Sequence, residues 1–206
     1  MNTITTAQAA QFLMEHDDFL ILTHVRPDGD TVGSAAALCA GLWALGKTAY
    51  LLPNPELTDT AAPYFRPYAA PADFQPERVV STDIAAAALF PENAKPYAER
   101  VDLAIDHHPS FEGFGRENYV RPSAAATGEI IYDILAELGP ITAEMALPLY
   151  VAVSTDCGCF AYNNTTAHTH AVAAALLRTG IDFQAVNKTF FRTKTKKRLA
   201  LEAAML

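Results

Sequence analysis

Three short apolar segments of this chain end in acidic or imidazole side chains, and this pattern constrains the fold most. The segments and their polar ends are 19–23 with His24, 79–82 with Asp83, and 101–105 with Asp106, His107 and His108. Apolar runs of this length are typical of buried strands, and helical patterns lie between them. We therefore predict an α/β fold with a mostly parallel sheet and helices on both faces. In such folds, ligands bind outside the carboxyl ends of the strands.

The rest of the chain alternates between helical patterns and breakers. A further strand is expected at 48–52, where Pro53 stops it. Residues 53–78 are rich in proline, and we expect loop and short helix there. The predicted helices cover residues 4–16, 31–45, 127–138, 142–153, 166–178 and 184–206. Gly46 and Gly180 follow two of these helices and are typical of helix ends.

Composition narrows the class of protein. With 206 residues, half of them apolar, the chain can bury one domain. We find no secretory signal at the N-terminus and no apolar stretch of roughly 18 residues that could cross a membrane. The three cysteines are odd in number and unevenly spaced, which favours a reducing environment and a cytoplasmic location.

The formal net charge of −8 argues against binding of long duplex nucleic acid. It leaves small phosphate esters open, because bound metal ions supply positive charge locally. One basic cluster stands out, and it consists of Lys188, Arg192, Lys194, Lys196, Lys197 and Arg198. It is interpreted either as the solvated face of a C-terminal helix or as a contact for an oligonucleotide backbone.

The polar ends of the strands indicate a metal site. Asp and His are ligands for hard or borderline divalent ions such as Mn²⁺. An isolated Asp after a strand is often a helix cap or a turn former. Several carboxylates at one edge are different, because they repel each other unless a cation neutralises them.

Four motifs in order resemble those of the DHH phosphoesterase family, which is named after the triplet seen here at residues 106–108. The motifs are His24–Asp30, Asp83, Asp106–His108 and Thr155–Phe160. The resemblance spans about residues 18–190. Each motif is weak alone, but four in the correct order are specific.

The resemblance implies a cage for two divalent metal ions, expected to be manganese. The implied ligands are His24 and Asp28 for one ion, Asp30 and His107 for the other, Asp83 bridging both, and Asp156 completing the cage. His108 is expected to face the substrate phosphate. Asp106 is expected to orient a neighbouring histidine.

The implied reaction is hydrolysis of a phosphate ester by a metal-activated water, with no covalent intermediate. His108 would stabilise charge on the phosphoryl group or protonate the leaving oxygen. The expected substrates are small nucleotides, either short oligoribonucleotides or phosphoadenosine phosphate. The alternatives are cyclic dinucleotide hydrolysis, pyrophosphate hydrolysis, and a metal-binding domain without catalysis. A homodimer is compatible with the sequence.

Many members of the family carry a second, glycine-rich domain that binds the nucleotide. The sequence contains no such segment. We expect a DHH domain at 1–185 and a linker-type helix at 186–206.

A few other residues have weaker interpretations. Arg26 lies within the first motif and either contacts a substrate phosphate or is exposed to solvent. Cys157 and Cys159 are expected to be reduced thiols, not a metal site. His168 and His170 are expected at the start of a helix, with substrate contact as the alternative.

Overall fold

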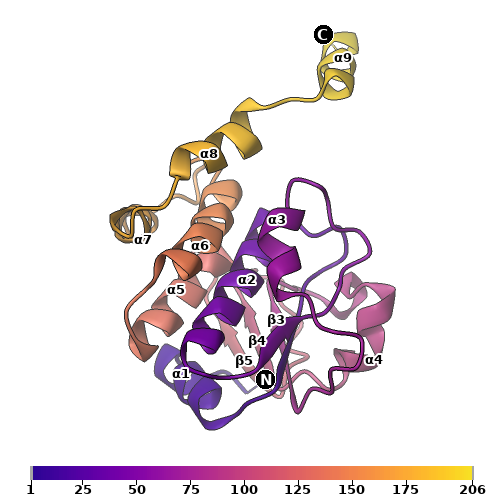
Figure 1. The fold of residues 1–206 in the computed structure, drawn as a ribbon, viewed down its shortest axis with the longest axis vertical. Coiled ribbons are helices and arrows are strands. Elements are labelled where there is room, and N and C mark those ends of the chain that lie inside the picture. Colours follow the sequence, from indigo (N-terminus) through magenta and orange to yellow (C-terminus); the bar gives the residue numbers. More distant parts are fainter. Residues whose placement is uncertain (1, 206) are drawn as a thin grey trace.

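The computed structural model describes residues 2–205 and contains a five-stranded parallel sheet (Figure 1). The strands are β1 (Phe19–Leu22), β2 (Ala49–Leu51), β3 (Arg78–Thr82), β4 (Leu103–Asp106) and β5 (Glu117–Val120). Their order across the sheet is β2-β1-β3-β4-β5, and every pairing is parallel. The predicted fold class is confirmed.

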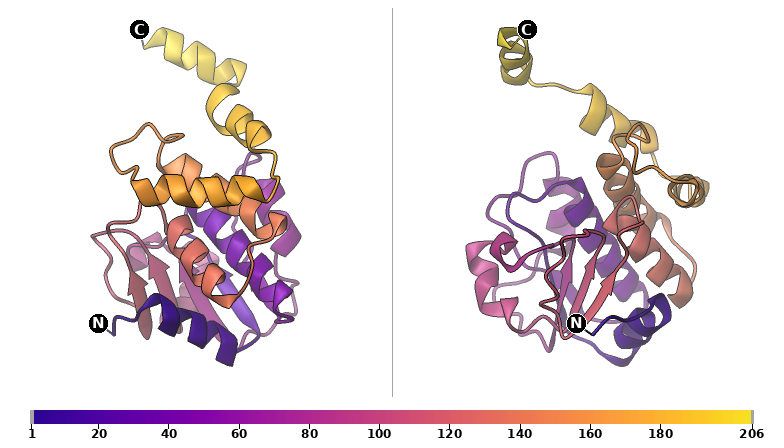
Figure 2. Two further views of the ribbon diagram at one scale, coloured as in Figure 1. Left: turned by 90° about the vertical axis from the view of Figure 1, so that its left-hand side faces the viewer. Right: turned by 180° about the vertical axis from the view of Figure 1, so that it is seen from behind.

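The strands are apolar because both faces of the sheet are covered. All residues of β1 and β4 are buried, as expected for parallel strands between two layers. Long helices pack on one face, and α4 (Lys95–Ala98) lies on the opposite side (Figures 1 and 2). The opposite layer also has an apolar cluster that includes Leu22, Val79, Phe90 and Phe111.

The long helices over the first face are α1 (Thr6–Glu15), α2 (Gly29–Ala44), α5 (Thr127–Leu138) and α6 (Ala143–Asp156). Helix α2 is central to this layer, and its residues 29–42 are all buried. It packs against α6 with little side-chain volume between the two backbones. A Cβ atom on Gly33 would lie 2.3 Å from the carbonyl oxygen of Pro148 in α6. A small residue at position 33 therefore sets the separation of these helices.

The topology creates a crevice between β1 and β3. From β1 the chain passes through α2 to β2 on one side, and then crosses to β3 on the other side of β1. Ligands of open α/β sheets bind at such a switch point, outside the carboxyl ends of the strands. His24 follows β1 and Asp83 follows β3, so both residues lie at this crevice.

The predicted element boundaries were mostly close, with one strand missed. Strand β5 was not predicted, since half of its four residues, Glu117 and Asn118, are polar. Buried Asn118 bonds the backbone of Gly115 through both side-chain atoms, at 3.0 and 2.9 Å. The proline-rich part at 53–78 contains short helices at Ala62–Phe65 and Arg66–Tyr68, as expected.

The C-terminal segment differs from the single helix predicted at 184–206. After α7 (Ala167–Arg178) it forms α8 (Phe183–Asn187), a π-helical turn at Lys188–Arg192, and then α9 (Lys196–Ala204). Residues 193–195 are not helical, and α9 lies away from the sheet in every view (Figures 1 and 2). No residue of α9 is buried, so no packing favours a continuous helix. Across residues 2–205, no helix combines the length and apolar character needed to cross a bilayer.

Candidate metal centre

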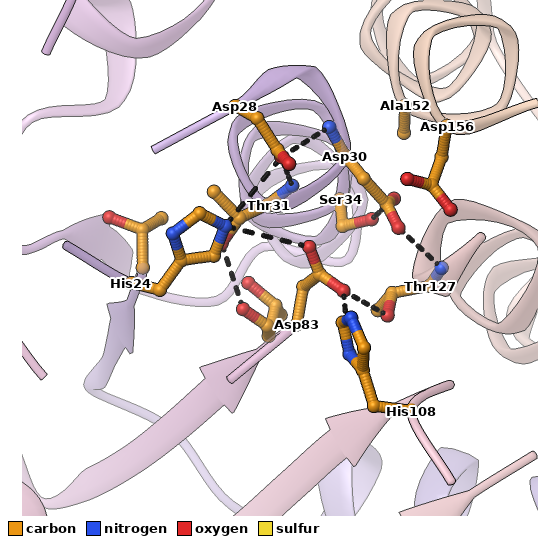
Figure 3. A network of polar contacts seen from close by, with 12 residues as sticks. His24, Asp28, Asp30, Thr31, Ser34, Asp83, His108, Thr127, Ala152 and Asp156 are labelled. Carbon is orange, nitrogen blue, oxygen red and sulfur yellow. Dashed lines mark hydrogen bonds and ion pairs between the residues drawn. The ribbon is translucent and has the colours of Figure 1, made fainter. Parts of the chain in front are cut away.

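The first motif contributes three side chains that converge at the start of α2 (Figure 3). Asp28 is the N-cap of α2, and its Oδ1 accepts hydrogen bonds from the N–H groups of Asp30 and Thr31. The same Oδ1 lies 3.6 Å from Nε2 of His24. His24 donates its Nδ1–H to the carbonyl of Val25 at 2.7 Å, which leaves the Nε2 lone pair free for a metal ion.

Asp83 lies between two histidines. Its Oδ2 is 3.8 Å from Nε2 of His24, and its Oδ1 is 3.6 Å from Nε2 of His107. The hydroxyl of Thr127 donates to Oδ1 at 2.9 Å. The backbone of Asp83 has a φ of 62°, a left-handed conformation that Asp and Asn adopt more readily than most residues. The turn after β3 thus aims this carboxylate at two separate groups of ligands.

A second group of ligands lies on the other side of Asp83. Nε2 of His107 is 3.8 Å from Oδ2 of Asp30 and 3.6 Å from Oδ2 of Asp156. His107 Nδ1 lies 3.2 Å from the carbonyl oxygen of Ala124, which can only accept a hydrogen bond. Nε2 is therefore again free for a metal ion. Asp156, the last residue of α6, lies next to Asp30 (Figure 3).

Asp30 is held in place by groups that the sequence analysis did not identify. Its carboxylate accepts hydrogen bonds from the N–H groups of Thr127 and Gly128, at 2.7 and 3.0 Å, and from the hydroxyl of Ser34 at 3.0 Å. The two N–H groups belong to the first turn of α5, where a negative charge is favoured. Asp30 is only 1% exposed, so these hydrogen bonds are its main compensation for burial.

The carboxylates in the cage are electrostatically strained without a counter-ion. Burial and the charges of Asp83, Asp156 and Asp28 hold the pKa of Asp30 well above its usual range. Burial and neighbouring carboxylates likewise raise the pKa of Asp83, and burial raises that of Asp156. A divalent cation would relieve this repulsion, and the oxygen and imidazole donors fit such an ion.

The donors form two main sets of potential ligands, each with atoms within 4.8 Å of one another. One set is His24, Asp28 and Asp83, and the other is Asp30, His107 and Asp156. A third combination of Asp83, His107 and His108 satisfies the same distance limit. The structure therefore brings all six expected ligands together, and Asp83 lies between the two main sets.

His108 and Asp106 form a tight pair beside the cage. Nδ1 of His108 donates to Oδ1 of Asp106 at 2.7 Å, and the same oxygen accepts the backbone N–H groups of His107 and His108. The hydrogen bond to Asp106 raises the pKa of His108, although partial burial opposes it. The side chain of Asp106 is fully buried and that of His108 is 41% exposed. Asp106 therefore fixes the ring of His108 so that its other edge faces the cleft.

Other residues singled out in the sequence lie outside these sets. His168 is near the start of α7 and contacts Asp133 at 3.1 Å, while the ring of His170 stacks on Phe160. The cysteines are free thiols, as expected. Cys157 is buried, and its sulfur accepts a hydrogen bond from the N–H of Phe160.

Comparison with known proteins identifies the family. The family model described as "DHH family, N-terminal domain" matches residues 18–153. This chain belongs to the DHH family. It is 36% identical over 162 residues to the bifunctional oligoribonuclease and PAP phosphatase NrnA of Thermus thermophilus, an alignment covering 78% of this chain and 50% of that protein. It is 25% identical to NrnA of Bacillus subtilis, with 87% of this chain and 58% of that protein covered.

Solved structures share the fold of this DHH domain. An exopolyphosphatase-related protein from Bacteroides fragilis has a TM-score of 0.85 at 24% identity, with 97% of this chain and 63% of that chain covered. Exonuclease RecJ bound to manganese has a TM-score of 0.53 at 15% identity, with 93% and 56% covered. The chain spans about half the length of the NrnA proteins it matches.

Proposed function

We propose that this chain is a two-metal phosphoesterase that hydrolyses small nucleotides, namely short oligoribonucleotides or phosphoadenosine phosphate. The observation that carries the proposal is the position of Asp83, whose two oxygens face His24 and His107 at 3.8 and 3.6 Å. One carboxylate is thereby shared between two sets of ligands. Similarity to NrnA proteins supports the substrate class.

The metal ligands in this proposal are the six residues of the cage. His24 and Asp28 would hold one ion, Asp30, His107 and Asp156 would hold the other, and Asp83, which faces a histidine of each set, would contribute to both. Divalent cations, expected to be manganese, would supply a nucleophilic hydroxide near neutral pH and neutralise the phosphoryl group. The N–H groups of α5 favour the ionised form of Asp30 and orient its carboxylate toward the place of the ion.

His108 acts on the substrate in this proposal. It lines the same open cleft as His24, Asp83 and Asp156. Because Asp106 raises its pKa, His108 is protonated over more of the neutral range and can donate a proton to the leaving oxygen. Asp106 is a positioning residue, since its carboxylate is buried and reaches the cleft only through His108.

The proposal is tested with purified protein loaded with Mn²⁺ and a panel of four substrates: a fluorescent dinucleotide, phosphoadenosine phosphate, cyclic di-AMP and pyrophosphate. We expect turnover of the first two. A chain that binds two manganese ions but turns over none of the four is a binding domain, and the enzyme proposal is then wrong. If cyclic di-AMP alone or pyrophosphate alone is turned over, the substrate class is reassigned to that compound.

The pair of Asp106 and His108 predicts a change in pH dependence. Asp106→Asn keeps the acceptor oxygen but removes the charge that raises the pKa of His108. The pKa of His108 then falls, so the protonated form is lost at lower pH. The alkaline limb of the profile of kcat against pH should move to lower pH, and kcat should fall about 10- to 100-fold.

Asp133→Asn is the matched control for this experiment, because Asp133 also contacts a histidine, His168, but lies outside the cage. It should leave the alkaline limb in place. If Asp106→Asn lowers kcat but leaves the limb where it is, Asp106 does not act through the protonation of His108.

A further inference from the structure

Arg26 is fixed at the edge of the cage by the residues around it. It lies between the ligands His24 and Asp28, in a left-handed conformation with a φ of 52°. The preceding residue, Val25, donates its N–H to the carbonyl of Leu89 at 2.7 Å and accepts the Nδ1–H of His24 through its own carbonyl. These bonds hold the backbone on the N-terminal side of Arg26, so its side chain starts from a defined point.

Arg26 is one of the residues that line the cleft containing the cage. This open cleft has a volume of about 400 Å³, which is within the range of small-molecule sites. Its lining residues are His24, Val25, Arg26, Asp28, Asp83, Leu89, His108 and Asp156. Among these lining residues, Arg26 alone carries a permanent positive charge. Arg26 is exposed to solvent, whereas Asp83 is buried.

The guanidinium of Arg26 is not used within the protein. Across residues 2–205, it has no carboxylate within ion-pair distance and no hydrogen bond. Arg116 and Arg121, in contrast, each pair with an aspartate, at 2.8 and 2.6 Å. An unpaired guanidinium beside a cleft offers two parallel N–H donors to an anion, and phosphate matches that geometry.

We propose that Arg26 binds a second phosphate of the substrate, one that is not hydrolysed. This inference rests on the proposed function. The scissile phosphoryl group would lie against the cage and His108, where bound cations would neutralise it. Arg26 at the exposed edge remains available for another phosphate of the same nucleotide. The chain should therefore prefer nucleotides with two phosphates, such as adenosine 3′,5′-bisphosphate, over the matching 3′-monophosphate.

The test compares release of the 3′-phosphate from adenosine 3′,5′-bisphosphate and from adenosine 3′-monophosphate. Arg26→Gln should lower kcat/KM for the bisphosphate about 10- to 100-fold, mainly through KM, since a hydrogen bond between charged groups is lost. The change for the monophosphate should be less than about threefold, so the preference disappears. Arg26→Lys should restore part of it.

An equilibrium measurement supplements the kinetics. Adenosine 5′-monophosphate retains only the phosphate assigned to Arg26, and its dissociation constant, measured by isothermal titration calorimetry, should rise about 10-fold or more in Arg26→Gln. Arg100→Gln is the matched control, because Arg100 precedes β4 and lies at the amino ends of the strands, away from the cage. This substitution should change neither the kinetics nor the affinity for adenosine 5′-monophosphate.

The outcomes separate this inference from the proposed function. If the wild-type protein releases phosphate from neither nucleotide and also fails to cleave the fluorescent dinucleotide, the proposed function fails. If it cleaves the dinucleotide but releases phosphate from neither nucleotide, the proposed function stands and the inference about Arg26 is overturned. If it is active and Arg26→Gln lowers kcat/KM equally for both nucleotides, Arg26 acts on the scissile phosphate and the inference is overturned. Unchanged kinetics together with unchanged binding of adenosine 5′-monophosphate would overturn it as well.

Discussion

Asp83→Asn should abolish activity and the response to manganese while making the metal-free protein more stable. Asn tolerates the left-handed backbone at this position and can still accept the hydrogen bond from Thr127. The substitution therefore removes the charge with little change in structure. Loss of several kcal/mol of metal-derived stabilisation of the transition state corresponds to a decrease in kcat/KM of at least about 10³-fold.

The gain in stability follows from the crowded carboxylates. In the metal-free protein, Asp83 is buried beside Asp28, Asp106 and Asp156, and its charge is unfavourable. We expect the melting temperature of metal-free Asp83→Asn to exceed that of the wild type by about 2 °C or more, equivalent to roughly 1 kcal/mol. Manganese should raise the melting temperature of the wild type and not that of the variant.

The crowded carboxylates also predict how the stability of the metal-free protein depends on pH. The pKa values of Asp30 and Asp83 are raised in the folded state. Between the unfolded and folded pKa values, the folded state binds more protons, so the stability of the metal-free protein falls as pH rises. This slope should be shallower in Asp83→Asn, as measured by urea unfolding in the presence of a chelator.

Asp102→Asn is the matched control for these measurements. Asp102 is also a buried carboxylate, but it lies at the amino ends of the strands, away from the cage. There it pairs with Arg116 and accepts a hydrogen bond from the N–H of Val79. Its replacement should lower stability and leave the manganese response intact. A manganese-dependent rise in melting temperature that persists in Asp83→Asn would show that this carboxylate does not bind the ions.

Gly33→Ala should destabilise the protein strongly, although alanine is the better helix former. A Cβ atom here would lie 2.3 Å from the carbonyl oxygen of Pro148 and 2.7 Å from the backbone nitrogen of Ala152. Backbone atoms cannot rotate away, so α2 and α6 must separate. Because the clash is with backbone atoms, we expect a cost of about 3 kcal/mol, at the upper end of the usual range for overpacking. The melting temperature should then fall by about 6 °C or more.

The same change should impair the cage. Asp30 lies in the first turn of α2 and Asp156 is the last residue of α6, so separation of the helices moves the two ligands apart. Gly41→Ala is the matched control in the same helix. The three atoms nearest to the added Cβ all belong to the side chain of Leu135, which can adopt another rotamer, and we expect a change of less than about 2 °C. Equal effects of the two substitutions, measured by thermal unfolding, would contradict this account of the helix packing.

The sequence could indicate which of these side chains lie close together, because the proposed ligands follow local signals. Each apolar run ends where a polar residue begins, and parallel strands bring these ends to one edge. His24, Asp83 and His107 could therefore be placed together before the fold was known. The supports of the cage carry no such signal. Thr127 is 97 residues away from Asp30, and only the packing of α5 against α2 brings them into contact.

The parts of the fold that the sequence did not predict have a physical reason in common. Strand β5 has two polar residues among four, and the side chain of buried Asn118 is compensated by hydrogen bonds to the backbone of Gly115 and Asn2. The break at residues 193–195 occurs where no side chain of the following helix is buried. In both places, tertiary contacts or their absence outweigh the local sequence pattern.

The most direct test of the two-metal proposal is anomalous diffraction at the manganese edge from crystals soaked in Mn²⁺. We expect two peaks, one among His24, Asp28 and Asp83, and another among Asp30, His107 and Asp156, with Asp83 next to both. A single peak, or two peaks of which neither contacts Asp83, would contradict the proposed centre.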